Sequence, residues 1–168
     1  MHSEATRDTA EAGLEETSTV NEHNHCYICF TQKGFDASRT IELLTSCGSV
    51  IAICRDRGLL EEMKRLSAAE CYIWTQKPGA DRLDPSSLNR CISLVRSRLE
   101  LGARTVVLEG VEYLELVNGM RETELFLSHL SDAAADAEGI LLILLHENTL
   151  EERNVQHLAA SCSASVLN

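Results

Sequence analysis

The sequence has few lysines and no long apolar run, and each shortage excludes a class of protein. Only Lys33, Lys64 and Lys77 are lysines, and 26 acidic residues against 15 basic ones give a net charge of -11. Nucleic acids and anionic bilayers are bound through clustered Lys and Arg, so neither is expected as a partner. The longest apolar run, residues 140–145, is far shorter than the ~18 residues that a membrane span requires.

Paired cysteine spacings and the features of a signal peptide are also missing. The first residues have neither a basic start nor an apolar stretch. The seven cysteines are odd in number and scattered, and most lie in apolar runs such as VIAIC and CYIW. A free thiol packs there as a small hydrophobic group. These features favour a protein of the reducing cytoplasm.

The N-terminal segment differs in composition from the rest of the chain. Residues 1–22 contain six acidic residues against one arginine, and after the initial Met only Leu14 and Val20 are large and apolar. Such a segment buries too little apolar surface to offset the entropy lost on ordering it. We therefore expect a flexible acidic tail over residues 1–23 and a single folded domain over residues 24–168.

From Cys26 onward, short apolar runs alternate with amphipathic stretches of helical length. The runs are CYICF, SVIAICR, ECYIWT, RTVVLEG, ILLILLHE and, more weakly, SASVLN. Strands that are apolar throughout are typical of a parallel sheet covered by helices on both faces. With only two prolines in the chain, the pattern predicts an α/β three-layer sandwich with a mainly parallel sheet of five to six strands.

Helix starts and ends can be placed between these runs. The expected helices cover residues 36–48, 59–66, 84–102, 120–137 and 149–158. Asp84 followed by Pro85 is typical of a cap and a first helical position. Thr149 with Glu152 three residues later predicts a capping box.

The turn after the first strand lacks the sequence of a phosphate-binding loop. A P-loop has several glycines before Gly-Lys-Ser/Thr, whereas here Lys33 precedes Gly34 and no glycine lies upstream. Asp36 stands where an anion would bind, and an acid at a helix N-terminus competes with phosphate. The chain also lacks GxGxxG, GxSxG and the strand-end acids and lysine of a receiver domain. We assign no catalytic residue and no cofactor.

Two histidines and two cysteines near the start of the domain raise the possibility of a metal or redox site. They are His23, His25, Cys26 and Cys29. Cysteines three positions apart in a strand point to opposite faces, and redox CxxC motifs lie at a helix N-terminus. Core thiols are favoured and no metal is assigned, with a thiol or metal sensor as the weakest of three hypotheses.

Ligands of parallel α/β sheets bind at the carboxyl ends of the strands, so the polar residues there are the candidates. Glu109 ends an apolar strand, Glu112 and Tyr113 follow, and His146 ends the most apolar strand. In ATPases with a RecA-like core such an acid holds magnesium or activates water, but without a P-loop it has no phosphate to act on. A structural role is favoured, in which Glu109 caps the following turn or pairs with an arginine such as Arg55.

The segments VVLEGVEYLELVNG, LFLSHL and ILLILLHENTLEER resemble an archaeal family known as domain of unknown function 835. SVIAICRDRG and YIWTQKPGADRLDPSSL agree with that family in order. The resemblance covers the chain from Cys26 to its end. Its most specific part is Gly-Val-Glu-Tyr-Leu followed by Asn118-Gly119.

The resemblance implies a RecA-like core without a phosphate loop, of the kind that accompanies sensory domains in signalling proteins. It implies no established activity. It places a shared surface at Arg55, Glu109, Gly110, Glu112, Tyr113, Asn118 and Gly119. The family usually has Asp-Gly and Asp-Pro where this chain has Glu109-Gly110 and Glu147-Asn148, and both departures fall at strand ends.

Two main hypotheses follow. In the first, the domain is a non-enzymatic regulatory or signalling module whose partner is a protein, either a sensory kinase or a second copy of the chain. In the second, it senses a small molecule or nucleotide at the crevice beside the strand ends. The binding residues expected are Arg55, Glu109, Glu112, Tyr113, Asn118 and His146.

Overall fold

The computed structural model describes residues 24–31, 39, 48–66, 69–147 and 149–167. The predicted acidic tail, and all but the two described positions of the helix expected over residues 36–48, lie outside these ranges. The strands are β1 (Cys26–Thr31), β2 (Ser49–Cys54), β3 (Ala69–Trp74), β4 (Arg82–Leu83), β5 (Ala103–Glu109), β6 (Ile140–His146) and β7 (Ser165–Leu167). The helices are α2 (Arg57–Lys64), α3 (Leu88–Glu100), α4 (Val111–Asn118), α5 (Met120–Asp136) and α6 (Glu152–Ser161).

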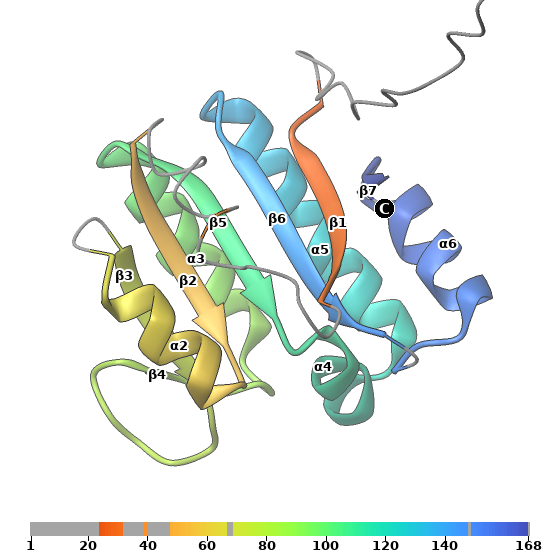
Figure 1. Ribbon diagram of the computed structural model, residues 1–168, viewed down its shortest axis with the longest axis horizontal. Helices are drawn as coiled ribbons and strands as arrows, with labels where there is room; N and C mark the ends of the chain where they lie inside the picture. Colours follow the sequence, from red (N-terminus) through yellow and green to blue (C-terminus); the bar gives the residue numbers. More distant parts are fainter. Residues whose placement is uncertain (1–23, 32–38, 40–47, 67–68, 148, 168) are drawn as a thin grey trace, which may run out of the picture.

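The strands form one parallel sheet in the order β4-β3-β2-β5-β6-β1-β7 (Figure 1). This confirms the predicted parallel α/β sheet, although it has seven strands rather than five to six. The additional strand is β4, which has two residues beside the end of β3. A strand of that length is too short to show any periodicity in the sequence.

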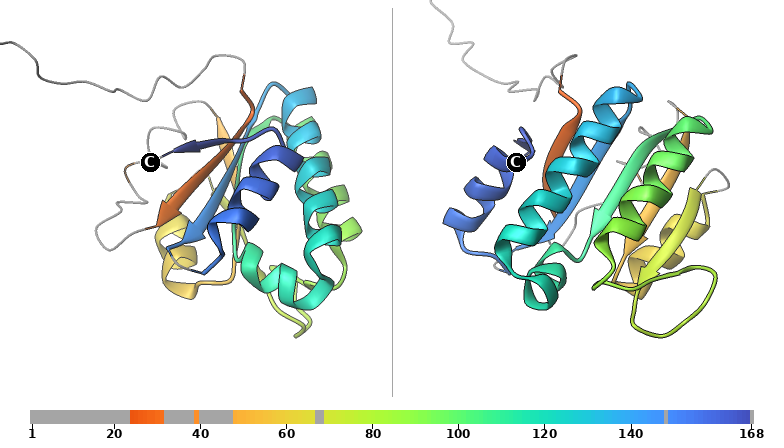
Figure 2. Two further views of the ribbon diagram at one scale, coloured as in Figure 1. Left: turned by 90° about the vertical axis from the view of Figure 1, so that its right-hand side faces the viewer. Right: turned by 180° about the vertical axis from the view of Figure 1, so that it is seen from behind.

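Helices cover both faces of the sheet and complete the three layers. Figure 2 shows α3, α5 and α6 on one face and α2 on the other, with α4 near the carboxyl ends of the strands. The larger core cluster lies under α3, α5 and α6 and includes Phe126 and Ile143. The smaller one lies under α2 and includes Met63. In the described part of the chain, none of the helices is long and apolar enough to cross a membrane.

The alternation of side chains along β1 confirms the interpretation of the two cysteines. Cys26 belongs to the larger core cluster and Cys29 to the smaller one, so the two thiols lie on opposite faces of the sheet. A hydrogen bond with the Cys162 thiol, together with burial, raises the pKa of the Cys26 thiol, and burial raises the pKa of Cys29. A reactive redox thiol requires the opposite shift, so both side chains behave as core groups.

Two predicted helix starts are wrong. α3 begins at Leu88 after the N-cap residue Ser87, because Asp84 forms a local turn instead. Its carboxylate accepts hydrogen bonds from the backbone N–H and the hydroxyl of Ser86, at 2.9 and 2.7 Å, which lowers the pKa of Asp84. The predicted capping box is also absent: Glu151 is the N-cap of α6, and Thr149 donates its hydroxyl proton to the carbonyl of His146 at 2.6 Å.

The core prediction concerns Ile143, which is fully buried at the middle of β6 between β5 and β1. We expect Ile143→Ala to lower the free energy of unfolding by about 2–5 kcal/mol, through lost burial and a residual cavity. Leu116→Ala on α4 is the matched control, because Leu116 is 84% exposed, and it should change stability by less than about 0.5 kcal/mol. Urea unfolding measures both. Equal losses in the two variants would contradict this assignment of the core.

Candidate functional site

A chain of hydrogen bonds joins the carboxyl ends of four neighbouring strands, β2, β5, β6 and β1. Glu109 ends β5 and contacts the residues that follow β2 on one side and His146 of β6 on the other. His146 contacts Thr31 of β1, with which it is in register. The sheet order brings these groups together although 37 positions separate Glu109 from His146. The predicted site is therefore assembled at one edge of the sheet.

Glu109 is 2% exposed, and both of its carboxylate oxygens have partners. Oε2 accepts the backbone N–H groups of Arg55 and Asp56 at 2.7 and 2.8 Å. These are the first residues after β2, so the carboxylate fixes the turn that leads into α2. Two charge-assisted bonds of this kind compensate a buried carboxylate for the water it has lost.

Arg55 does not neutralise Glu109 with its side chain. Its guanidinium carbon lies 3.7 Å from the centroid of the Tyr113 ring, in a cation–π contact. The turn between β5 and α4 passes close by, because Gly110 has a φ of 93° and a Cβ there would lie 3.1 Å from Cβ of Arg55. The proposed ion pair between Glu109 and Arg55 is therefore replaced by a bond to the Arg55 backbone.

The contacts of Thr31 link its hydroxyl to the position of the proton on His146. Thr31 Oγ1 lies 3.2 Å from the carbonyl oxygen of Leu145 and 2.8 Å from Nδ1 of His146. A hydroxyl has one proton to donate, so a Thr31 that donates to Leu145 accepts from Nδ1–H, and one that donates to Nδ1 leaves the proton of the neutral ring on Nε2. In the first arrangement Nε2 is a bare acceptor that faces Oε1 of Glu109 at 3.2 Å, and in the second Nε2–H donates to that oxygen.

The same contacts bear on a nucleophilic relay. Thr31, His146 and Glu109 follow one another as hydroxyl, imidazole and carboxylate, the order of groups in hydrolytic triads. A general base must present an unprotonated nitrogen to the hydroxyl. With the proton on Nδ1, the Thr31 hydroxyl donates to Leu145 and is not activated.

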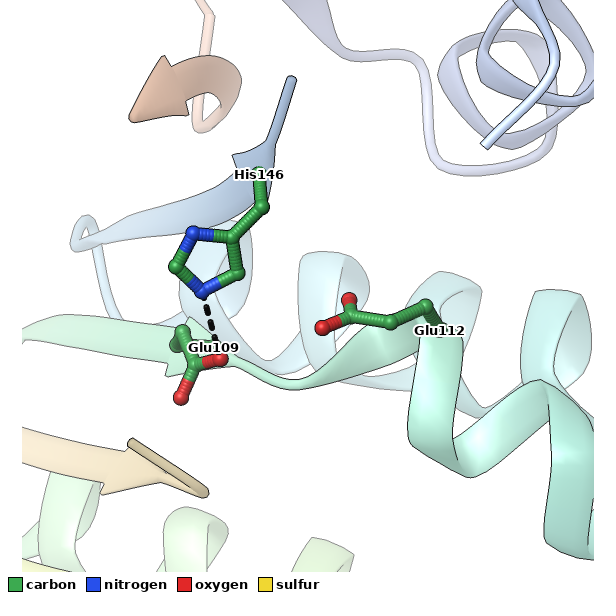
Figure 3. Close-up of side chains that lie close together, drawn as sticks. All are labelled: Glu109, Glu112 and His146. Carbon is green, nitrogen blue, oxygen red and sulfur yellow. Dashed lines mark hydrogen bonds and ion pairs between the residues drawn. The ribbon is translucent and has the colours of Figure 1, made fainter. Parts of the chain in front are cut away.

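Glu112, in the first turn of α4, completes a cluster with Glu109 and His146. Ligand atoms of the three side chains lie within 4.8 Å of one another, and Figure 3 shows Glu112 extending toward the other two. Oε2 of Glu112 is buried and has no hydrogen-bond partner among the described residues. The environment is negative: burial, and then the charges of Glu112 and Glu124, raise the pKa of Glu115 on the same helix.

Asn118, the sixth predicted site residue, lies apart from this cluster. Its amide donates to the carbonyls of Pro85 and Leu114 at 2.9 and 3.0 Å, at the opposite end of α4 from Glu112. It ties the helix to the segment before α3. Arg55, Glu109, Glu112, Tyr113 and His146 are thus brought together, whereas Asn118 has a structural position.

Thr31 and Trp74 also lie at this edge and were not predicted from the sequence. Thr31 is the polar residue that follows the apolar run CYICF at the end of β1. That position at a strand end could have identified it as a candidate site residue. Trp74 ends β3, is 3% exposed and packs edge-to-face on Phe126. Its indole nitrogen has no hydrogen-bond partner within the described ranges. No pattern in the sequence indicates that contact.

Glu109 provides the stability prediction for the site. Glu109→Ala leaves two backbone N–H groups without an acceptor, and we expect a loss of about 3 kcal/mol in the free energy of unfolding. Glu109→Gln retains a carbonyl oxygen for those groups and should lose roughly 1 kcal/mol. Urea unfolding compares the two, with Glu112→Ala as a near-neutral control. Equal losses for Ala and Gln would show that the bonds to the turn do not stabilise it.

Comparison with known proteins gives one match. No curated protein matches the chain. A model of the family described as "Protein of unknown function (DUF835)" matches residues 30–161, which includes β5, α4 and β6 with the whole cluster. This confirms the resemblance seen in the sequence over most of the chain. The chain therefore belongs to the DUF835 family of proteins of unknown function.

Proposed function

We propose that this domain is a non-enzymatic regulatory or signalling module that acts by binding a protein. The observation that carries the proposal is the burial and hydrogen bonding of the Glu109 carboxylate. Glu109 is the acid at the strand end where a RecA-like ATPase would act on its nucleotide. Glu109 is 2% exposed, two backbone N–H groups already hold Oε2, and Oε1 faces His146. In this position it fixes the turn after β2. The RecA-like origin of the core, and an archaeal source, stay predictions.

Electrostatics at the strand ends support the same proposal. Glu109 and Glu112 place two carboxylates side by side, and the field of Glu112 also acts on Glu115. A nucleotide phosphate carries the same sign of charge and is repelled at short range. Nucleotide hydrolysis depends on placing positive groups around the phosphates. The cluster offers the opposite charge.

The outer face of α4 gives a surface for a protein partner. Leu116 is 84% exposed and Val117 37% exposed, on the helix that also carries Glu112 and Tyr113. Large apolar side chains presented together to water gain free energy when a partner covers them. The partner we propose is a sensory kinase or a second copy of the chain.

A second candidate function is small-molecule sensing at the same edge. It is favoured by Arg55, which is exposed and stacked on Tyr113 beside the cluster. An arginine held on an aromatic ring presents both charge and a flat apolar face to a ligand. A thermal shift with a nucleotide that Arg55→Ala abolishes would favour this function over the first.

The enzymatic prediction is the absence of turnover. Purified protein mixed with ATP or GTP and Mg²⁺ should release phosphate no faster than the same nucleotide releases it without protein. The reason is that the Glu109 carboxylate is already bonded to the turn after β2. Glu109→Gln, which preserves the shape of the side chain, should behave in the same way. Phosphate release by the wild type that Glu109→Gln abolishes would overturn the proposal of a non-enzymatic module.

Self-association provides a test of the α4 surface. If the partner is a second copy, sedimentation at increasing concentration will show dimers that Leu116→Asp converts to monomers. Leu101→Asp is the matched control, because Leu101 is 77% exposed at the end of α3, and it should leave the dimers intact. A wild-type chain that stays monomeric contradicts self-association. Equal effects of the two variants contradict the assignment of the interface to α4.

A further inference from the structure

We propose that Glu109, Glu112 and His146 bind one divalent transition-metal ion, at a position we call the cation site. The ligand atoms are carboxylate oxygens of the two glutamates and Nε2 of the histidine, all within 4.8 Å of one another (Figure 3). Three elements, β5, α4 and β6, deliver them to one point. This inference goes beyond the proposed function, because an ion can be held here whether or not the domain binds a protein.

The first support is the contact between Glu109 and His146. When Thr31 donates to Leu145, Nδ1 of His146 donates to Thr31, and Nε2 of the neutral ring has only a lone pair. That lone pair faces Oε1 of the buried Glu109 carboxylate at 3.2 Å. Two acceptors at this separation repel each other unless a second proton or a cation lies between them. A metal ion satisfies both at once.

The second support is the third ligand. Oε2 of Glu112 is buried and has no hydrogen-bond partner in the described part of the chain. Leaving a carboxylate oxygen desolvated and unpaired is costly, more so beside a second carboxylate. Figure 3 shows this side chain directed toward the Glu109–His146 pair. A cation at that point compensates two negative charges and the unpaired oxygen together.

The third support is Thr31, which orients the imidazole. Histidines that bind metals nearly always donate their other N–H to an oxygen, which fixes the tautomer and the ring plane. Thr31 Oγ1 lies 2.8 Å from Nδ1, placed to accept this N–H while its own proton goes to the carbonyl of Leu145 at 3.2 Å. The nitrogen left for the ion is the one that faces the two glutamates.

The ligand set selects the class of ion. Imidazole favours first-row transition metals over Mg²⁺ and Ca²⁺, while carboxylates accept Zn²⁺ and Mn²⁺ alike. Metal–ligand bonds of about 2.1 Å place opposite ligands roughly 4.2 Å apart. The widest separation here, within 4.8 Å, closes to that value by a small rotation of Glu112. His146 is 39% exposed, which leaves water a way to the remaining coordination positions.

The experiment is a titration of the full-length chain, without a histidine tag, with Mn²⁺. The free ion is followed by electron paramagnetic resonance. Mn²⁺ is the probe because it prefers oxygen and nitrogen ligands and competes poorly for the seven cysteines. We expect one saturable site per chain. Zn²⁺ should displace Mn²⁺ at lower concentration, in the Irving–Williams order, and Mg²⁺ should not displace it at equal concentration.

Variants assign the binding to the cation site. Glu112→Gln and His146→Gln should each weaken Mn²⁺ binding by more than about tenfold, and Thr31→Val by about tenfold through loss of the orienting bond. Glu112→Gln is the principal variant, because the Glu112 side chain has no hydrogen bond to a described residue to lose, and the variant should fold normally by circular dichroism. Glu115→Gln, one turn along α4, and His157→Gln, on the exposed side of α6, are the matched controls and should bind like the wild type.

Two results would overturn the proposal. One is the absence of saturable Mn²⁺ binding by the folded wild-type chain, which would mean that a hydrogen on Nε2, and no ion, bridges His146 and Glu109. The other is binding that survives both Glu112→Gln and His146→Gln, which would place the ion elsewhere on this acidic chain. Neither result bears on nucleotide turnover, so the proposed function is tested separately.

Discussion

The carboxylate of Glu109 is the group on which the arrangement of the strand ends depends. It is buried at the end of β5, near the centre of the sheet, where an uncompensated charge would be strongly destabilising. Its bonds to the turn after β2 and its contact with His146 therefore define where the neighbouring elements begin and end. The start of α2 follows from this, because Asp56 both donates to Glu109 and caps the helix at Leu59. One buried charge thus positions a helix on the opposite face of the sheet from α5.

The central strands could be predicted because β1, β2, β5 and β6 are apolar on both faces, a pattern typical of parallel sheets. Elements without that pattern were not predicted from the sequence. β4 has two residues, and α4 has only eight, in which Glu112 and Glu115 interrupt the apolar side chains. In the structure Leu114 is buried and Leu116 is exposed, so the apolar side chains wrap around a helix. The boundary at Asp84 failed for a different reason: Asp favours a local turn as readily as a helix cap.

That these side chains lie together at one edge of the sheet was predictable, whereas the contacts between them were not. Glu109 and His146 were identified from their positions at strand ends, and the parallel sheet brings such positions to one edge. The hydrogen-bond partners of these side chains depend on the strand order and register of the sheet. No short stretch of the sequence shows either of these. The sequence suggested an ion pair between Glu109 and Arg55, yet the backbone of Arg55 makes that contact and its side chain lies on Tyr113. Asn118 was grouped with the site through the family resemblance, and an eight-residue helix places it at the end of α4 away from Glu112.

The length of the side chain at position 109 explains how one carboxylate serves two neighbours. Oε2 reaches across to the amides that follow β2, while Oε1 faces β6 and His146. An aspartate would be shorter by one carbon–carbon bond, about 1.5 Å, and on the same backbone it would lose contact with one side. The two oxygens of Glu109 therefore make different contacts: Oε2 is fixed by the turn after β2, and Oε1 faces the cluster. This division reconciles a structural role for Glu109 with a ligand-binding one, because the bonds that hold the turn also fix the oxygen that faces Glu112 and His146.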